Sequence, residues 1–247
     1  MQRRKIKLTI AYDGTEYHGW QVQPGMKTVQ ETLCKAATGL VGRKVHVHGA
    51  SRTDAGVHAL GQAGLIETVT PIPTENFPRA LNDRLPRDIA VLSAEEPPNW
   101  NFDLIGDVTR KLYRYTICTT KIRPVRDIRF VWHLPGQIDI TAMQEAAQHL
   151  VGKQDFRSFA SAADQRKSSV RTVFRCDVLT CGDNILIEVE GDGFLYNMVR
   201  NIVGTLVEIG MGKRPAVQMG AILAARDRSQ AGATAPAHGL CLMAVRY

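Results

Sequence analysis

Apolar and polar residues alternate at the start of the chain, and this pattern then gives way to a helical one. Residues 5–12 alternate with a period of two, which is typical of a half-buried strand. Residues 29–41 carry an apolar stripe with helical spacing, and the preceding Thr28-Val-Gln-Glu31 has the form of a capping box. The same reasoning predicts strands over 44–48, 62–68 and 88–94 and a helix whose apolar face spans 77–85. The order strand, helix, strand, strand, helix, strand is that of a split βαβ, or ferredoxin-like, unit.

A second series of elements follows the chain breaker Pro97-Pro98 and repeats this order. Its strongest helix, over residues 195–211, keeps the helical period for three turns. The other predicted elements are strands over 111–119, 171–179, 184–189 and 240–245, an apolar run at 130–132, and helices starting at Asp139 or Thr141 and at Pro215. We therefore predict an α+β fold of two ferredoxin-like (split βαβ) halves, residues 1–104 and 105–247. These halves would share an extended, mostly antiparallel sheet, with the active-site cleft between them.

The composition is that of an ordinary globular protein. Of its 247 residues, 44% are hydrophobic and 22% are charged, which fits one large domain or two small ones. No stretch approaches the length of a membrane span, and the N-terminus lacks the apolar core of a signal peptide. The five cysteines form no Cys-x-x-Cys pair, so we expect them to be reduced and the protein to be cytoplasmic.

The formal net charge of +7 points to a polyanionic partner. Nucleic acid is favoured over a membrane surface, because no basic cluster lies on a helix with an apolar face. The four basic clusters are Arg3-Arg4-Lys5-x-Lys7, Arg110-Lys111-x-x-Arg114, Lys121-x-Arg123-x-x-Arg126-x-x-Arg129 and Arg166-Lys167-x-x-x-Arg171.

The stretch Gly49-Ala-Ser-Arg-Thr-Asp-Ala-Gly-Val-His58 places one carboxylate, Asp54, among small residues. Small side chains and glycines let a backbone turn tightly, and we expect them to let a nucleotide approach Asp54. Arg52 stands two residues earlier, so both side chains would point the same way in an extended chain. Spacing alone also fits a polar turn, because aspartate is a common turn residue.

Two residues of the second half are candidates to work with this carboxylate. Tyr113 lies in the predicted strand 111–119, where an aromatic side chain is also common for structural reasons alone. Arg200 lies on the flank of the apolar stripe of helix 195–211. A buried arginine needs an anion, although the long side chain could instead reach solvent from the edge of the core.

Other chemistries have weaker support. His46-x-His48 could hold a metal, but no carboxylate or cysteine cluster completes a site, so solvent-facing strand residues are favoured. The sequence contains no nucleotide phosphate loop. Ser51 and His58 are residue types of a hydrolase triad, but three members on one short loop rarely reach triad geometry.

Five blocks of sequence closely resemble the TruA family of tRNA pseudouridine synthases. The match runs in order from the first strand to Tyr247, and the Arg-Thr-Asp-Ala-Gly-Val-His string is highly specific. The blocks are Tyr12-Asp-Gly-Thr-Glu-Tyr-His-Gly-Trp-Gln21, the stretch from Gly49 to His58, Lys111-Leu-Tyr-Arg-Tyr115, Asn197-Met-Val-Arg-Asn-Ile-Val-Gly204 and Thr234-Ala-Pro-Ala-His-Gly-Leu240.

The resemblance implies an isomerase that converts uridine to pseudouridine at positions 38, 39 and 40 of the tRNA anticodon arm. It also implies a homodimer that binds tRNA across both subunits, without a metal or organic cofactor. Asp54 matches the catalytic aspartate, and Arg200 matches the basic residue that pairs with it. Tyr113 matches the tyrosine that packs on the target base, Arg52 an arginine that helps hold the flipped nucleotide, and Leu240 an apolar residue lining the site.

The resemblance leaves two points open. Asp54 could act as a nucleophile or as the base that removes the C2′ proton. Cys241 stands where many members have an aromatic residue, which puts the packing beside the site in doubt.

The hypothesis from another class is a non-catalytic RNA-binding module, which would need an exposed pair of stacking aromatic residues that the sequence lacks.

Overall fold

The first strand and helix show how the sequence pattern builds the fold. The computed structural model describes residues 3–247, in which β1 spans Arg4–Tyr12 and α1 spans Val29–Val41. Ile6, Leu8 and Ile10 of β1 are almost completely buried, and the residues between them are partly exposed. The Thr28 hydroxyl caps α1 by accepting a hydrogen bond from the Glu31 amide at 3.4 Å. The predicted strand and the predicted helix cap are both confirmed.

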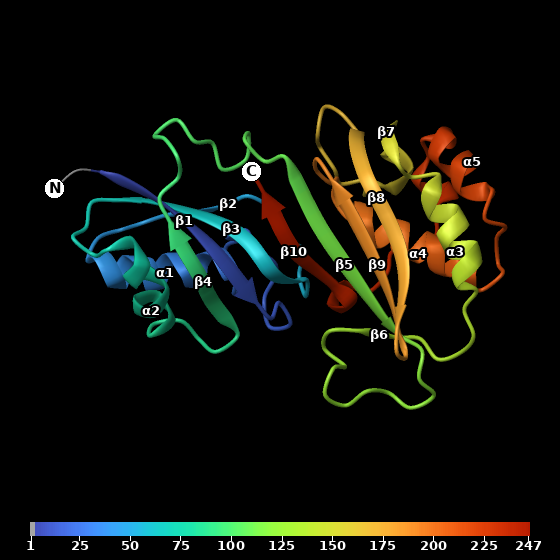
Figure 1. Ribbon diagram of the computed structural model, residues 1–247, viewed down its shortest axis with the longest axis horizontal. Coiled ribbons are helices and arrows are strands. Elements are labelled where there is room, and N and C mark those ends of the chain that lie inside the picture. Colours follow the sequence, from blue (N-terminus) through green and yellow to red (C-terminus); the bar gives the residue numbers. More distant parts are fainter. Residues whose placement is uncertain (1–2) are drawn as a thin grey trace. The chain divides into compact units, whose positions relative to one another are not determined.

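The described chain divides into two units, which we call unit 1 (residues 3–109 and 241–247) and unit 2 (residues 110–240). In unit 1, β1 pairs antiparallel with both β3 and β4, and β2 pairs antiparallel with β3 (Figure 1). The last strand, β10, pairs parallel with the start of β3. The remaining bounds are β2 Val47–Gly49, β3 His58–Thr68, α2 Phe77–Asn82, β4 Ile89–Glu95 and β10 Leu240–Arg246, with a short 3-10 turn at Thr74–Asn76.

The core of unit 1 lies on both sides of its sheet. On one side α1 and α2 bury Leu33, Phe77 and Leu81 together with the apolar face of β1. On the other side a smaller cluster joins the sheet to the segment after β4 and to the C-terminus. Its buried members are Ala50, Ala63, Leu65, Phe102 and Leu104, with Val108, Val245 and Tyr247 packed against them.

Unit 2 combines an antiparallel sheet with three helices. Its strand order is β5-β9-β8-β7, and the short β6 pairs parallel with β5. The helices α3, α4 and α5 lie together beside β8 (Figure 1). The strands are β5 Arg110–Cys118, β6 Trp132–His133, β7 Gly152–Asp155, β8 Val170–Cys181 and β9 Asn184–Gly191, and the helices are α3 Ile140–Gln148, α4 Met198–Gly210 and α5 Gln218–Ala225. The chain is therefore a mixed α+β protein with mostly antiparallel strands, as the sequence predicts.

Several element boundaries differ from the sequence-based ones. The helix α4 begins at Met198, three residues later than predicted, because Asn197 is in the left-handed region with φ 61°. The strand β7 was not predicted, since Gly152-Lys-Gln-Asp155 has no alternating apolar residues. The contacts of β10 place it with unit 1, whereas its position in the sequence had assigned it to the second half.

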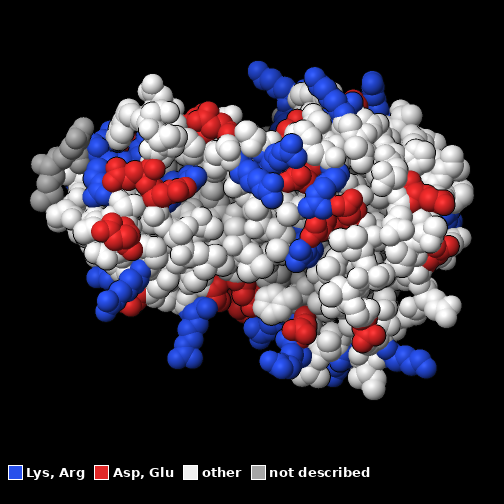
Figure 2. All heavy atoms as spheres, in the orientation of Figure 1, with Lys and Arg blue, Asp and Glu red and all other residues white. Residues whose placement is uncertain are grey.

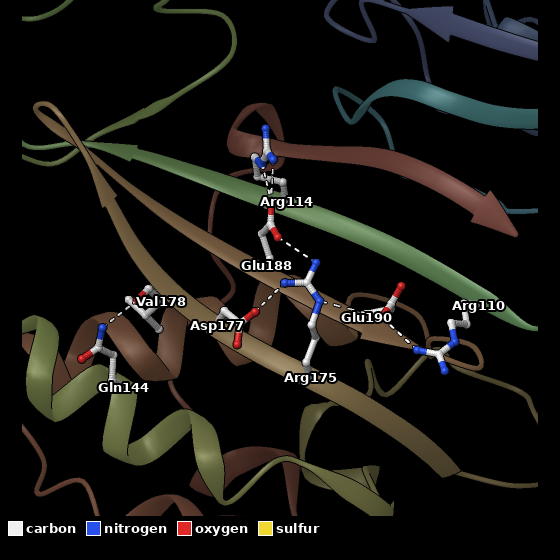
Figure 3. Close-up of polar contacts among 8 residues, drawn as sticks. All are labelled: Arg110, Arg114, Gln144, Arg175, Asp177, Val178, Glu188 and Glu190. Atoms are coloured by element: carbon white, nitrogen blue, oxygen red, sulfur yellow. Dashed lines mark hydrogen bonds and ion pairs between the residues drawn. The ribbon is translucent and has the colours of Figure 1, made fainter.

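The sheet of unit 2 carries a network of charged residues on the side away from its apolar core. Glu188 and Glu190 alternate along β9 with the fully buried Ile187 and Val189, and both acids are at most 7% exposed. Arg114 donates to Glu188 at 2.9 and 2.6 Å, and Arg175 donates to it at 2.9 Å (Figure 3). A buried carboxylate needs such partners, because burial without them is very costly.

Candidate active site

Asp54 lies in the loop between β2 and β3 of unit 1. The Val57 amide donates to the Asp54 carbonyl oxygen at 3.1 Å, and Gly56 has a φ of +76°, so residues 54–57 form a tight turn. The Asp54 side chain is half-buried, and Arg52 is exposed. The turn expected from the sequence is therefore present, and it leaves the carboxylate partly accessible.

A completely buried glutamine, Gln62 of β3, holds the first part of this loop. Its Oε1 accepts from the Ser51 amide at 3.1 Å, and its Nε2 donates to the Ser51 carbonyl at 2.7 Å. The side-chain amide thus takes the place of a strand neighbour where β2 has ended. Beside it, the hydroxyls of Tyr12 and Thr53 are 2.7 Å apart. Without Gln62, the buried amide and carbonyl of Ser51 would lose these hydrogen bonds, and each unpaired group would destabilise the fold.

The loop after β1 supports the Asp54 loop from its other side. The Trp20 amide donates to the Thr53 carbonyl at 3.1 Å. A side chain at Gly49 would overlap the Trp20 indole, and Ala50 belongs to the core of unit 1. The expectation that these two small residues make room for a nucleotide is therefore wrong. They make room for the protein's own side chains, which hold the loop in place.

His58 has a structural role at the start of β3. Its Nδ1 accepts from the Gly14 amide at 3.0 Å and lies 3.2 Å from Asp13 Oδ1. The side chain is 4% exposed, so the imidazole closes the turn after β1 from inside the fold. This geometry argues against the hydrolase triad that Ser51 and His58 suggested.

Tyr113 of unit 2 lies in β5 and packs against an aromatic residue from the turn before α4. Its ring meets that of Phe194 edge to face, with centroids 5.3 Å apart and an angle of 89° between the planes. Only 6% of Tyr113 is exposed. Such edge-to-face pairs are favourable beyond the area they bury, so the Tyr113 ring has a defined orientation.

Arg200 is held by acceptors from two segments of unit 2. Its Nε donates to the Ala235 carbonyl at 2.8 Å, and its Nη1 donates to Asn197 Oδ1 at 3.0 Å. The Ala235 amide in turn donates to the Arg200 carbonyl at 3.1 Å. The guanidinium is thus oriented within the fold and does not extend freely into solvent.

Residues near the end of unit 2 lie around the same arginine. The Tyr115 hydroxyl donates to the Pro236 carbonyl at 2.8 Å. Burial raises the pKa of Tyr115, and the positive charge of Arg200 opposes that rise. Burial also lowers the pKa of His238, and Arg200 lowers it further. Leu240, which is 5% exposed, begins β10. The half-buried Cys241 follows it and lies opposite His58 in the parallel pairing of β10 with β3.

Comparison with known proteins identifies the family. Residues 8–105 and 146–247 match the family profile described as tRNA pseudouridine synthase. The tRNA pseudouridine synthases A of Geotalea uraniireducens, Caldicellulosiruptor saccharolyticus and Ruminiclostridium cellulolyticum are 43%, 41% and 44% identical to the chain, over 99% of the chain and 100% of each relative. The chain belongs to the tRNA pseudouridine synthase family. It is an isomerase that acts on tRNA, converting uridine to pseudouridine.

A solved structure titled "Crystal Structure of a Cbf5-Nop10-Gar1 Complex" aligns with 99% of this chain and 58% of that one, at 11% identity and a TM-score of 0.35.

The structure places the expected residues of this tRNA pseudouridine synthase in two groups. Asp54 and Arg52 belong to unit 1, and Tyr113, Arg200 and Leu240 belong to unit 2. Sequence reasoning missed Gln62 and Lys111. Burial lowers the pKa of Lys111 to about 8, and the nearby Arg166 and Arg171 lower it further. The sequence signals for Lys111 were its place in a basic cluster and in the block Lys111-Leu-Tyr-Arg-Tyr115, two residues before Tyr113.

The basic clusters of this synthase differ in how many of their charges form ion pairs with acidic residues of the same chain. Arg110 and Arg114 bind Glu190 and Glu188, and the N-terminal cluster pairs with Glu67, Glu95 and Glu96. Figure 2 shows such neighbouring blue and red groups on the face in view. In the cluster from Lys121 to Arg129, no ion pair is formed within residues 3–247. These ion pairs leave the net charge of +7 unchanged, but they confine the unbalanced positive charge to basic residues such as those of this cluster.

Two negative findings apply to the described part of the chain. Among residues 3–247, no group of three or more histidine, cysteine or acidic side chains is arranged to hold a metal ion. The same residues include no helix that is both long and apolar enough to span a membrane. His46, just before β2, and His48, within it, are both exposed, with their ring centroids 4.5 Å apart.

Proposed function

We propose that this enzyme modifies uridines 38, 39 and 40 in the anticodon arm of tRNA, with Asp54 as the catalytic carboxylate. The observation that carries the proposal is the position of Asp54: a half-buried carboxylate on a loop held by Gln62, Tyr12 and Trp20. A reactive group that is fixed in advance needs little reorganisation in the transition state.

The reaction requires that the N1–C1′ bond of uridine breaks, that the uracil turns, and that C5 joins C1′ with loss of the C5 proton. Asp54 would act next to the sugar, either as the nucleophile at C1′ or as the base for the C2′ proton. Both routes need an ionised carboxylate. In our proposal the guanidinium of Arg200 comes close to Asp54 and supplies this condition, since a close cation lowers a carboxylate pKa by about 1–3 units.

The target base has to leave the helix stack before the reaction, because its atoms are inaccessible within it. In our proposal Tyr113 packs on the flipped base, Leu240 lines the pocket around it, and Arg52 helps to hold the nucleotide out. The edge-to-face contact with Phe194 supports this role for Tyr113, because it orients the ring. The proposal requires residues of both units to meet around one uridine.

We also propose that the two units derive from split βαβ halves. The antiparallel order β4-β1-β3-β2, with α1 after β1 and α2 after β3, supports this for unit 1. In unit 2, β9 lies between β5 and β8 as β3 lies between β1 and β2. That shared order makes a common architecture the simplest account.

Tritium release from tRNA carrying 5-tritiated uridine tests the catalytic role of Asp54. We expect the wild type to release tritium and Asp54→Asn to lose release by a factor of at least about 10³, corresponding to about 4 kcal/mol of transition-state stabilisation. Asp83→Asn makes the same change at an exposed aspartate of unit 1 and should keep full activity. Substantial release by Asp54→Asn would show that this carboxylate is not catalytic.

Arg200→Met tests the partner of this carboxylate. We expect it to lower tritium release far more than tRNA affinity, and equal losses would indicate a phosphate contact instead. We further propose a homodimer, which the resemblance implies, and a cytoplasmic location, which the cysteines favour because they form no Cys-x-x-Cys pair. Light scattering over a range of protein concentrations would test the first, since a monomer at every concentration would contradict it.

A further inference from the structure

Unit 2 contains a cavity lined by arginine and serine side chains that the proposed chemistry does not use. Its volume is about 320 Å³, which is at the lower end of the range for ligand pockets. It lies between the segment 157–169, the start of the turn before α4 and the chain after α5. The polar residues that matter here are Arg157, Arg166, Arg226, Arg228, Ser161 and Ser168. None of the residues assigned to catalysis lines it.

The four arginines differ in how they are neutralised. Arg166 pairs with Asp164 at 2.5 Å, and Arg226 pairs with Asp155 at 3.2 Å. Arg228 donates only to neutral oxygens, those of Asn201, Thr234 and Ala231.

Arg157 is exposed, and its guanidinium forms no hydrogen bond within residues 3–247. Arg157 and Arg228 therefore bring two positive charges that no ion pair balances, against one negative charge from the exposed carboxylate of Asp227, which also lines the cavity and accepts hydrogen bonds from Ser229.

Asp164, the acidic residue paired with Arg166, is fully occupied. One oxygen accepts from the Arg166 amide at 2.9 Å, and the other accepts from the Tyr196 amide at 2.6 Å as well as from the Arg166 guanidinium. Its negative charge is thus used to hold the loop that forms the wall of the cavity. It adds little net repulsion toward an anion, because the positive charge of Arg166 balances it in the ion pair.

Two further basic residues, Lys111 and Arg171, interact electrostatically with Arg166 of the cavity. Lys111 is close enough to Arg166 and Arg171 for both to lower its pKa, although burial is the larger cause. Burial and Arg166 likewise lower the pKa of Arg171, and the carboxylates of Asp192 and Asp164 partly oppose this. Like charges held together in a partly buried place repel each other, and a bound anion would relieve that repulsion.

We propose that this cavity binds a phosphodiester group of the RNA backbone, at a subsite separate from the catalytic residues. Guanidinium groups bind phosphate oxygens through two parallel hydrogen bonds, and serine hydroxyls add further donors. Such contacts position the RNA without reading its sequence. This inference rests on the proposed action on the tRNA anticodon arm and names part of the surface that holds it.

A pair of adjacent alanines allows a matched test. Ala162 is exposed and lines the cavity, whereas Ala163 is exposed and does not line it. Neither side chain makes a hydrogen bond, so Ala162→Glu and Ala163→Glu change the net charge equally and remove no polar contact. We expect Ala162→Glu to weaken tRNA binding about tenfold at 100 mM KCl, and Ala163→Glu to change it less than about twofold. Equal effects of the two variants would overturn the subsite.

The salt dependence of binding gives a second measurement. Removing one phosphate contact should reduce the slope of log affinity against log salt by about 1. We expect that reduction for Arg157→Gln, and no change for Arg43→Gln, which alters an exposed arginine of unit 1. A slope for Arg157→Gln equal to that of the wild type would overturn the proposal.

A free phosphate is the other possible source of the same ligand chemistry. Inorganic phosphate should raise the melting temperature of the wild type only weakly compared with tRNA. If Ala162→Glu abolished a phosphate-dependent rise in melting temperature and left tRNA affinity unchanged, the cavity would bind a free anion and the assignment to RNA would be wrong.

Failure of the subsite and failure of the proposed function give different results. Ala162→Glu should raise the KM for tRNA and leave kcat nearly unchanged, because the reacting uridine is elsewhere. A wild type that releases no tritium but shows the difference between the two glutamate variants would refute the proposed reaction alone. Normal release with no such difference would refute the subsite alone.

Discussion

Gly204 of α4 lies against the segment at Ala233–Ala235, which holds Arg200. Replacing glycine by alanine usually stabilises a helix, but at Gly204 we expect it to destabilise the protein. A side chain at Gly204 would overlap the carbonyl oxygen of Ala233 and lie 2.9 Å from its carbonyl carbon. Ordinary van der Waals contacts of a Cβ are 3.4–4 Å. The atoms in the way belong to the backbone, so no rotation of a side chain can relieve the overlap.

The magnitude follows from two opposing effects. Alanine is about 0.8–1.0 kcal/mol more favourable than glycine within a helix. Overpacking costs about 1–3 kcal/mol, and displacing the segment would also weaken the hydrogen bonds between Ala235 and Arg200, each contributing about 0.5–1.5 kcal/mol. We therefore expect Gly204→Ala to lower the free energy of unfolding by about 1–3 kcal/mol.

Two other helical glycines provide controls for Gly204→Ala. A Cβ at Gly39 of α1 would meet no atom within 4 Å, and one at Gly220 of α5 would lie 3.3 Å from the exposed His149 side chain. We expect Gly39→Ala to stabilise the protein by about 0.5–1 kcal/mol and Gly220→Ala to be neutral or slightly stabilising. Urea unfolding followed by circular dichroism measures all three variants.

The functional consequence separates this explanation from a general loss of stability. Because Ala235 accepts the hydrogen bond from Arg200 Nε, Gly204→Ala should also reduce tritium release at temperatures where the protein is still folded. If Gly204→Ala proved as stable as Gly39→Ala, the close approach of α4 to the segment at Ala233 would be refuted. Reduced stability with unchanged activity would refute the link to Arg200.

Two further predictions concern buried polar groups. Burial raises the pKa of Glu188, but hydrogen bonds from Arg114 and Arg175 outweigh it and leave the pKa below its ordinary value. The stabilisation is therefore complete above the unfolded pKa of about 4.3 and is lost as the pH falls through the folded pKa. Between pH 6 and pH 3, the free energy of unfolding should fall more for the wild type than for Glu188→Gln. Parallel curves of this free energy against pH would contradict the explanation. Gln62→Leu should lower the free energy of unfolding by about 1–3 kcal/mol, because the Ser51 amide and carbonyl lose their hydrogen bonds to Gln62. It should also lower kcat more than tRNA affinity. An unchanged kcat would show that Gln62 does not position Asp54.

Local patterns in the sequence were sufficient for most of the secondary structure. The alternation of β1, the capping box of α1 and the long apolar stripe of α4 depend on residues close together in the chain, so they could be predicted. The start of α4 could not, because the left-handed conformation of Asn197 is decided by the turn before it. β7 was missed for a related reason: its backbone pairs with β8, and its own residues carry no signal.

The candidate site divides in the same way. The sequence alone singled out Asp54 and supplied the family resemblance, because a rare string of residue types is a local property. It did not reveal that Gln62 brackets the loop or that Trp20 occupies the space beside Gly49.

Charge shows most plainly what only the tertiary structure decided. The sequence presented four similar basic clusters, yet Arg110 and Arg114 bind buried glutamates, whereas the cavity at Arg157 keeps positive charge that no ion pair balances. Periodicity is set by neighbours along the chain, but neutralisation of a charge and close approach of a backbone depend on residues that only folding brings together.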